Sequence, residues 1–385
     1  MIPRYRDEEI KNIWSTDNKL NTWLTVEIAH IESLNSMITD KTITQEETDE
    51  IKKHAKVNKE RWLEIEKETK HDFQAFVQML EESIPSNAGR WIHYGLTSSD
   101  VLDTTNIILC KKSLSVIAKR VACLISSLEK KTKSSEAKSR ILSRTHGKAA
   151  EIQTYRDVFK RWLDQVRRSY DLIVFTNSRI SWGKMSGPSG NYTTTNTVCE
   201  KVALNSLGLN PIRSSQIISR DIFLDYFYCI LKLMISLEKI AMDIRLYSIE
   251  EVNEMNEGFT ESQKGSSSMP HKKNPISTEN ICGLSRLYKS YFQTAVDNCY
   301  SFWERDISHS SSERIIFKDG AHIAAFTAQR LQNVIDNLVL NTEVALENCV
   351  KKENKLASQS TLNDLIKSGL SRKESHDISQ LKSNW

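Results

Sequence analysis

Apolar residues recur along most of this chain at intervals of three, four or seven positions, the spacing that gathers them on one face of an α-helix. After Asp103 one series comprises Ile107, Leu114, Ile117, Val121, Leu124 and Leu128. From Asp221 to Tyr247 a second series comprises Leu224, Phe227, Leu231, Met234, Leu237, Ala241 and Ile244, with further apolar residues beside it at Phe223, Tyr226, Ile230, Ile235 and Ile240. A helix that is apolar on more than one side is covered by more than one neighbour. The second series therefore predicts a helix inside a bundle that is shared between subunits.

Residues that break helices are rare, because the 385 positions include only 6 Pro and 12 Gly. Neither occurs between residues 4 and 84, 96 and 146, 212 and 257, or 320 and 369. A β-rich fold needs frequent turns, so this pattern predicts an all-α fold. We expect three segments: an N-terminal helical domain over 1–100, a central bundle of long helices over 101–345, and a short C-terminal helical segment over 346–385. Thr44 to Glu47 has the sequence of a capping box, which predicts a helix start.

The composition is that of an ordinary soluble protein, with 39% hydrophobic residues, 26% charged residues and a net charge of +4. No apolar run has the length needed to cross a membrane, and the N-terminus lacks the apolar region of a signal peptide, so we expect a cytoplasmic protein. Seven scattered cysteines, never spaced C-x-x-C, predict neither disulfides nor a zinc site. The absence of a basic block argues against nucleic acid as a partner.

One stretch is unusually rich in hydrogen-bond donors: Gly265-Ser266-Ser267-Ser268-Met269-Pro270-His271-Lys272-Lys273-Asn274-Pro275. Its glycine and serines expose N–H groups and hydroxyls, its lysines add positive charge, and its prolines prevent a continuous helix. A mobile loop of this kind, from about residue 258 to 275, is suited to close over an anionic substrate and stabilise charge that develops in a reaction. The simpler interpretation is a lysine-rich surface loop.

Other polar clusters interrupt the helical patterns: Arg4-Tyr5, Lys70-His71-Asp72 inside a predicted helix, His93 to Asp100, Arg144 to Gly147, Gln216, and Glu304 to Arg314. Simpler explanations exist for each. A lone helical histidine is more often packed or exposed than catalytic, Thr and Ser are good helix caps, and Glu/Arg pairs are common on surfaces. However, five of the nine histidines lie in these clusters or in the loop, which favours a polar site: His71, His93, His146, His271 and His309.

The loop resembles the mobile loop G-S-S-x-M-P-x-K-x-N-P of the fumarase/aspartase superfamily of lyases. With His271 before the lysines, it is similar to the branch that acts on succinylated purine nucleotides. The clusters R-Y, K/R-H-D, W-x-H-Y-G-L-T-S-S-D, R-T-H-G and E-R-D-I-S-H-S-S-x-E-R resemble the same branch in order and spacing, over essentially the whole chain. The resemblance implies an all-α, three-segment subunit and a homotetramer whose long helices form one bundle, with each active site built from three subunits.

The reaction implied by this resemblance is a β-elimination that releases fumarate from adenylosuccinate or from succinylaminoimidazole-carboxamide ribotide, both small-molecule nucleotides. By motif position Ser266 is the general base, His146 the general acid, and His71 assists at the leaving group. Positions matching contacts to the succinyl carboxylates, base or ribose are His93, Thr97, Ser98, Gln216, Ser267, Lys272 and Asn274. Those matching the nucleotide and phosphate end are Arg4, Tyr5, Arg305, Ser310 and Arg314, and the neighbours of His71, Lys70 and Asp72, are also assigned to substrate binding. No metal and no organic cofactor are implied.

The sequence departs from the family pattern at a few places, including Ser268, where the family usually has Ala or Thr, and Pro188 after Ser186-Gly187. The third segment stops several dozen residues earlier than in relatives, so we expect a naturally short form or an incomplete chain. Two other interpretations stay open. One is another lyase of the superfamily, such as an argininosuccinate lyase or a carboxymuconate cycloisomerase relative, against which the phosphate-end residues argue. The other is a catalytically silent helical scaffold, against which the retained Ser266, His146, His71 and Lys272 argue.

Overall fold

The computed structural model describes residues 1–36, 43–259, 268–269 and 271–383. The chain forms two compact units, each assembled from separate stretches of sequence. Unit 1 comprises Met1–Arg120, Ser169–Leu233 and Arg286–Phe326, and unit 2 comprises Val121–Arg168, Met234–Ser285 and Thr327–Trp385. Long helices supply residues to both units: α6 (Ser98–Lys133), α7 (Tyr155–Arg179), α9 (Asp221–Tyr247), α10 (Ile276–Asp297) and α11 (Ser308–Asp336).

The shorter elements each belong to one unit. Those of unit 1 are η1 (Pro3–Tyr5), α1 (Glu8–Ile13), α2 (Thr16–Asn35), α3 (Gln45–His54), α4 (Lys59–Thr69), α5 (Asp72–Ser83), η2 (Asn87–Trp91), β3 (Trp182–Gly183), α8 (Thr197–Ser206), β4 (Asn210–Pro211) and η4 (Asn298–Tyr300). Those of unit 2 are η3 (Glu136–Lys138), β1 (Arg140–Thr145), β2 (Lys148–Thr154), β5 (Met255–Asn256), β6 (Val339–Leu340), α12 (Thr342–Val350), α13 (Glu353–Leu356), α14 (Ser358–Lys367) and α15 (Arg372–Ser383).

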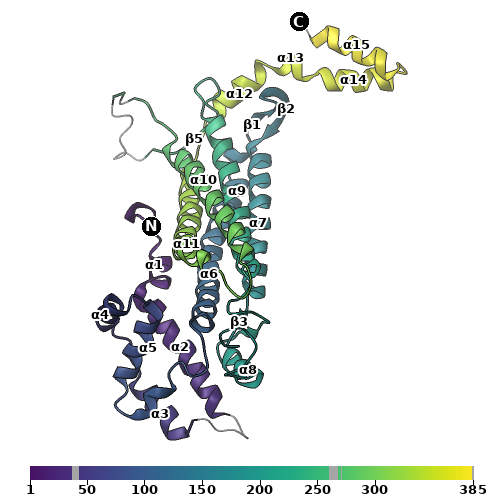
Figure 1. Cartoon of the computed structure of the whole chain (residues 1–385). Coiled ribbons are helices and arrows are strands. Elements are labelled where there is room, and N and C mark those ends of the chain that lie inside the picture. The colour runs from purple at the N-terminus through teal and green to yellow at the C-terminus, as the bar shows by residue number, and fades with distance from the viewer. Residues whose placement is uncertain (37–42, 260–267, 270, 384–385) are drawn as a thin grey trace. The chain divides into compact units, whose positions relative to one another are not determined.

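In unit 1 the helices α2 to α5 gather into one cluster around buried aromatic rings (Figure 1). Trp23 of α2 lies 5.2 Å from both Phe73 and Phe76 of α5, measured between ring centroids. The predicted capping box is confirmed, because the Thr44 hydroxyl accepts the Glu47 N–H and the Glu47 carboxylate accepts the Thr44 N–H. These short helices therefore have both defined starts and a shared apolar core.

The core of unit 1 continues between α9, α10 and α11. Phe317 of α11 packs against Phe223 and Phe227 of α9, at centroid distances of 5.3 and 5.0 Å. The hydroxyl of Tyr288 on α10 donates to the carbonyl of Phe227 at 3.2 Å. The side chains of α9 and α11 thus interlock, which fixes α11 at Phe317 against the rest of the unit.

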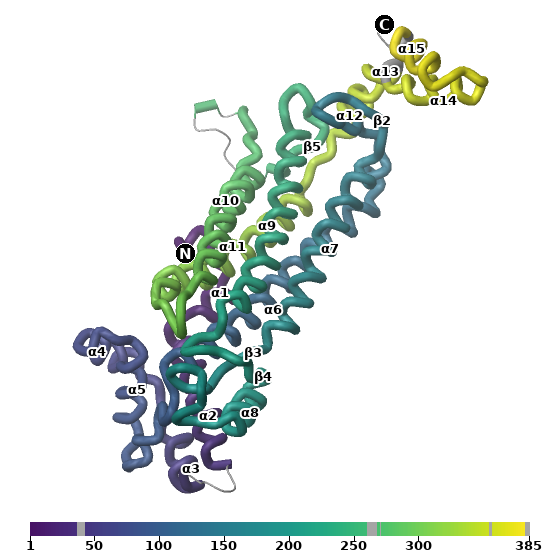
Figure 2. The backbone as a smooth tube through the Cα atoms, turned by 45° about the vertical axis from the view of Figure 1, so that its right-hand side comes forward, coloured from purple at the N-terminus to yellow at the C-terminus, as the bar shows by residue number. Residues whose placement is uncertain are grey.

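In unit 2 the strands β1 and β2 form an antiparallel hairpin, and α12 packs along β1 (Figure 2). The hairpin pairs Thr145 with Lys148 across a two-residue turn, and it contains a bulge between Leu142 and Arg144. At this bulge the Ser143 hydroxyl contacts both the N–H and the C=O of Glu151, each at 3.0 Å, and so replaces missing ladder bonds. The helices α14 and α15 pack against each other.

The predicted all-α class is confirmed, since the strands in the described part of the chain form only three two-stranded pairs among long helices. The predicted bounds of α9 match the structure, and all six apolar residues predicted along α6 are 0% exposed. On α9 the flanking residue Ile235 is 46% exposed. The three-segment division of the sequence stays a prediction.

One local prediction was wrong. Lys70-His71-Asp72 was expected inside a helix, but the helix breaks there. Lys70 ends α4 with a left-handed φ of 55°, and His71 caps α5 by accepting the Gln74 N–H at Nδ1 over 3.1 Å. Apolar residues have helical spacing both before Lys70 and after His71, so the hydrophobic pattern alone did not reveal the break between α4 and α5.

Candidate functional site

A cavity of about 260 Å³ lies in unit 1 and is walled by α2, α5, α6, α11 and the segments that precede α9 and α11. Its cationic side chains are Lys19, Arg220, Arg305, Arg314 and Lys318, and its anionic side chains are Asp72, Asp103 and Glu313. Cations therefore outnumber anions in its described lining. A concave site with this charge balance attracts an anionic ligand.

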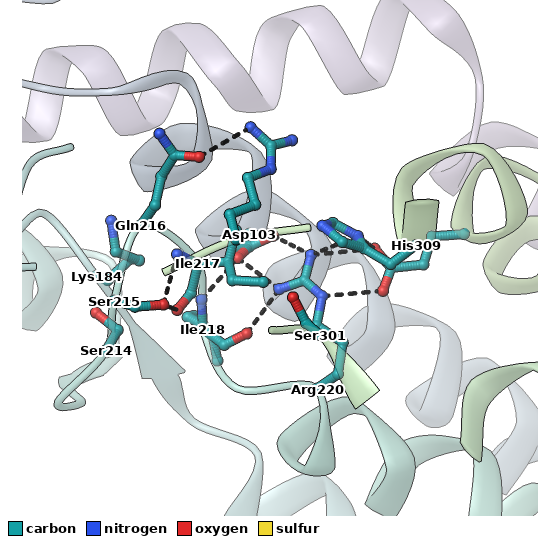
Figure 3. A network of polar contacts seen from close by, with 12 residues as sticks. Asp103, Lys184, Ser214, Ser215, Gln216, Ile217, Ile218, Arg220, Ser301 and His309 are labelled. Carbon is teal, nitrogen blue, oxygen red and sulfur yellow. Dashed lines mark hydrogen bonds and ion pairs between the residues drawn. The ribbon is translucent and has the colours of Figure 1, made fainter. Parts of the chain in front are cut away.

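Arg220, which lines this cavity, is the centre of a buried polar network (Figure 3). It donates to both oxygens of Asp103 at 2.7 and 2.9 Å, to both oxygens of Glu313 at 3.1 Å, and to the Ile218 carbonyl at 2.7 Å. These contacts use all five N–H groups of the guanidinium. Burial by itself would raise the pKa of Asp103, but Arg220 more than offsets this and holds that pKa below its ordinary value. Arg220 is thus satisfied within the protein.

The first turns of α11 contain two interleaved pairs of residues, each pair one helical turn apart. His309 and Glu313 are only 4% and 7% exposed, and His309 Nδ1 lies 3.1 Å from a Glu313 oxygen. The same Nδ1 lies 3.1 Å from Arg220 Nη2, but the five N–H groups of Arg220 already have acceptors. We therefore assign the proton on Nδ1 to His309, which donates it to Glu313. Ser310 directly follows His309 and Arg314 directly follows Glu313, and both also line the cavity. The helix therefore holds its buried pair and presents a second, more accessible pair to a ligand.

Arg314 is the more exposed of the two accessible residues, with 58% of its side chain accessible. Its Nη2 lies 2.8 Å from Asp72 Oδ2, at the first residue of α5. Such an exposed ion pair contributes little to stability, so Arg314 can exchange its partner at small cost.

Arg305 and Lys19 also line the cavity, and neither has a carboxylate within ion-pair distance in the described residues. Arg305 donates from Nη1 to Gln216 Oε1 at 3.3 Å, and its buried Nε has no partner there. Lys19 Nζ lies 4.8 Å from the ring centroid of Trp23 and 5.7 Å from that of Trp62. Burial lowers the pKa of both Arg305 and Lys19. An anion in the cavity would compensate for this loss of hydration.

The segment before α6 is held by two buried carboxylates. His93 has a left-handed φ of 61°, and Glu27, which is 0% exposed, contacts its Nδ1 at 2.8 Å and its N–H at 3.0 Å. The Thr97 N–H donates to Asp100 at 2.7 Å, and Asp100 also forms a fully buried ion pair with Lys184. The backbone that carries His93, Thr97 and the first residue of α6, Ser98, is therefore fixed from both sides.

The remaining predicted residues of unit 1 lie near chain ends or helix ends. Arg4 is exposed in η1, whereas the Tyr5 ring packs on Phe326 with centroids 5.3 Å apart. Lys70 and His71 are exposed and directly precede Asp72, the member of this cluster that lines the cavity.

In unit 2, His146 and Gly147 form the turn of the β1–β2 hairpin, with φ values of 54° and 74°. Positive φ at both positions is the geometry of the two-residue turn whose twist matches a hairpin. His146 is exposed at this tip. Asn274 lines a second cavity, of about 410 Å³. Lys272, two residues earlier in the sequence, is exposed. Ser266 and Ser267 lie outside the described residues.

The structure thus brings four predicted residues together around the first cavity, namely Asp72, Arg305, Ser310 and Arg314, with Gln216 bonded to Arg305. It does not place Arg4, Tyr5, Lys70, His71, His93, Thr97 or Ser98 in that lining. His146, Lys272 and Asn274 belong to unit 2. The roles assigned to all these residues stay predictions.

Comparison with known proteins decides the family. A family model described as lyase matches residues 4–287. A curated relative, the adenylosuccinate lyase of Bacillus subtilis (strain 168), is 35% identical over 384 residues, covering 99% of this chain and 88% of the relative. The chain belongs to the lyase family of the fumarase/aspartase superfamily.

Solved structures agree with this lyase in fold. A fumarate lyase from Mesorhizobium sp. BNC1 matches with a TM-score of 0.87 at 19% identity, over 99% of this chain and 87% of that chain. A β-carboxy-cis,cis-muconate cycloisomerase from Acinetobacter calcoaceticus sp. ADP1 matches with a TM-score of 0.85 at 16% identity, over 98% and 86% of the two chains. At these identities the likeness establishes the fold alone.

Sequence reasoning missed several residues that shape the cavity of the lyase. Lys19 gave no signal, because a lysine on an amphipathic helix is ordinary. Asp103 and Arg220 are far in sequence from the predicted cluster Glu304 to Arg314, which contains their partner Glu313. Only tertiary contacts reveal them. In the described part of the chain, no helix is long and apolar enough to cross a membrane, and no group of three or more His, Cys, Asp or Glu residues could hold a metal ion.

Proposed function

We propose that this lyase is an adenylosuccinate lyase that acts in purine nucleotide biosynthesis in the cytoplasm. It cleaves the C–N bond of adenylosuccinate to give AMP and fumarate. It cleaves the corresponding bond of succinylaminoimidazole-carboxamide ribotide to give the free carboxamide and fumarate. The observation that carries the proposal is the cationic cavity of unit 1, in which Arg305, Ser310 and Arg314 lie together.

The chemistry of the cavity suits the phosphate of a nucleotide. Arg305 and Arg314 can each donate two hydrogen bonds to one phosphate, and the Ser310 hydroxyl can add another. Arg305 enters this role without an ion-pair partner in the described residues, and its lowered pKa rises again when an anion neutralises it. Arg314 must share or release Asp72. Arg4 and Tyr5 complete the phosphate end in this proposal.

In the proposed reaction Ser266 removes the C–H proton next to a succinyl carboxylate. A serine hydroxyl is a weak base, so neighbouring N–H groups and Lys272 must stabilise its alkoxide. His146 protonates the leaving nitrogen, a role in which imidazole is common near neutral pH, and His71 assists at the same end. The electron pair of the C–H bond forms the double bond of fumarate as the C–N bond breaks. His93, Thr97, Ser98, Gln216, Ser267 and Asn274 hold the succinyl, base and ribose groups.

We further propose a homotetramer whose active sites combine residues from several subunits. The support is an apolar surface on α9: Tyr228, Ile235 and Met242 follow one another at intervals of seven and are 50%, 46% and 39% exposed, and Leu246 is 54% exposed. A soluble chain rarely leaves such a stripe in water, and a helix of another subunit would cover it. Closed two-fold symmetry would let the same stripe meet itself.

The decisive test is fumarate release from three succinyl substrates: adenylosuccinate, succinylaminoimidazole-carboxamide ribotide and argininosuccinate. We expect turnover of the first two substrates only, and the change in their ultraviolet absorbance measures it. Arg305→Met should raise KM for adenylosuccinate, whereas Arg167→Met, which removes an exposed ion pair with Glu129 in unit 2, should leave it unchanged. Turnover of argininosuccinate alone, or of none of the three, would refute the proposal.

A further inference from the structure

Glu254 is a buried carboxylate that neither the family comparison nor the proposed mechanism uses. It follows α9 and directly precedes β5, and it is 0% exposed. Both of its oxygens accept from Arg144, Oε1 from Nη2 at 2.6 Å and Oε2 from Nη1 at 2.7 Å. Oε1 also accepts from Asn348 Nδ2 of α12 at 3.0 Å. A buried carboxylate with a bidentate arginine and a third donor is held in one geometry.

The backbone of Glu254 is held as firmly as its side chain. Its carbonyl accepts the Tyr155 hydroxyl at 2.6 Å and the Asn341 N–H at 3.0 Å, and its own N–H donates to the Tyr247 carbonyl at 3.0 Å. One residue thus joins the end of α9, β1, the start of α7 and two positions of α12, its N-cap Asn341 and Asn348 within the helix. All of the residues in these contacts belong to unit 2.

Two of these contacts attach the hairpin that carries His146. Arg144 lies in β1, two residues before His146, and Tyr155 is the first residue after β2. The side chain of Glu254 therefore holds the strand that enters the turn, and its carbonyl holds the chain where it leaves the hairpin. Arg144 also donates to the Leu142 carbonyl at 3.3 Å, across the bulge of β1. Glu254 makes no direct contact with the turn residues His146 and Gly147, and His146 is exposed.

We propose that Glu254, acting through Arg144, is a positioning residue for His146. Its effect on the reaction rests on the proposed function, in which His146 is the general acid. The charge of Glu254 keeps Arg144 in place, Arg144 keeps β1 in place, and the two-residue turn then sets the position of the imidazole. A misplacement of about 1 Å in such a group costs roughly a hundredfold in rate.

The first test measures turnover in a double-mutant cycle. Glu254→Gln should lower kcat for adenylosuccinate by roughly a hundredfold with little change in KM, and Arg144→Lys should have the same direction of effect. In a His146→Ala background Glu254→Gln should cause almost no further loss, because the group it positions is gone. The matched control is Glu129→Gln, which breaks an exposed ion pair with Arg167 in the same unit and should leave kcat unchanged. Equal losses with and without His146 would overturn the proposal.

The second test does not depend on activity, so it separates this inference from the proposed function. Hydrogen exchange of residues 140–154 should become at least about tenfold faster in Glu254→Gln or Arg144→Lys than in the wild type or in Glu129→Gln. If Glu254→Gln does not fold, the milder Arg144→Lys carries the test. An unchanged rate in the hairpin would refute the positioning role even if adenylosuccinate is turned over. If exchange is faster in the variants but the wild type does not cleave adenylosuccinate, Glu254 still positions the hairpin. In that case only the link between this positioning and the proposed reaction is rejected.

Discussion

His322 provides a prediction about pH and stability. It lies on α11 and is 1% exposed, and its Nδ1 accepts the backbone N–H of Asp7 at 3.1 Å, so that nitrogen carries no proton. Burial lowers the pKa of His322 from 6.5 to about 4, and the N-terminal amino group acts in the same direction. In the unfolded chain the imidazole is hydrated and takes up a proton near its ordinary pKa. Falling pH therefore favours the unfolded chain.

The size of the effect follows from the two pKa values. For a group whose pKa is lowered by folding in this way, the stabilisation is complete above 6.5 and is lost as the pH falls toward 4. Between pH 7 and pH 5 the linkage amounts to about 2 kcal/mol, and the full loss below pH 4 is about 3 kcal/mol. A change of this size is a large share of the stability of an ordinary domain.

The assay is urea unfolding monitored by tryptophan fluorescence at pH 7 and pH 5. One protein concentration is used throughout, because the proposed assembly would make stability depend on concentration. His322→Asn keeps an oxygen that can accept the Asp7 N–H and does not titrate. We expect the variant to lose about 2 kcal/mol less than the wild type between the two pH values. His376→Asn, at an exposed histidine of α15, is the matched control and should follow the wild type. Equal pH dependence in all three proteins would refute this account of His322.

Four further predictions concern activity. Ser266→Ala and His146→Ala should each lower turnover by at least roughly a hundredfold without changing the assembly seen in light scattering; near-normal turnover of Ser266→Ala would reject its role as base. Arg314→Lys keeps the charge but loses the fork, so steady-state kinetics should show a rise in KM that exceeds the fall in kcat; an equal fall in kcat and kcat/KM would place Arg314 in the transition state. Lys19→Met should likewise raise KM for adenylosuccinate, and an unchanged KM would exclude Lys19 from the ligand site. Mixing inactive Ser266→Ala and His146→Ala subunits should restore partial activity, and mixtures that stay inactive after verified exchange would mean that each site lies within one chain.

The long helices were predictable because their signal is periodic and local. The spacing of apolar residues gave the bounds of α9, and the seam of α6 is fully buried as expected. The break at Lys70 and the hairpin around His146 were not predicted as such. Both depend on non-glycine residues, Lys70 and His146, in the left-handed conformation. Neither residue type indicates that conformation in a sequence.

The candidate site was predictable only where its residues cluster in sequence. Ser310 and Arg314 share one helix turn and were found by their motif, and the structure brings them into one cavity with Arg305. Lys19 and Arg220 reach the same cavity from distant parts of the chain. Lys19 is notable because it has no carboxylate partner in the described residues, and Arg220 because it is buried with all its N–H groups bonded. Composition and spacing do not reveal either property.

The interleaved pairs at the start of α11 divide labour between neighbouring positions. Glu313 accepts from both Arg220 and His309, and Arg220 has no donor left for a ligand, whereas Ser310 and Arg314 line the cavity and Arg314 makes an exposed ion pair. Under the proposed function, an exchange of Ser310 or Arg314 therefore alters the group that is recognised, while His309 and Glu313 preserve the scaffold. On that proposal, the substrate preference set by α11 can diverge one substitution at a time while the protein stays folded.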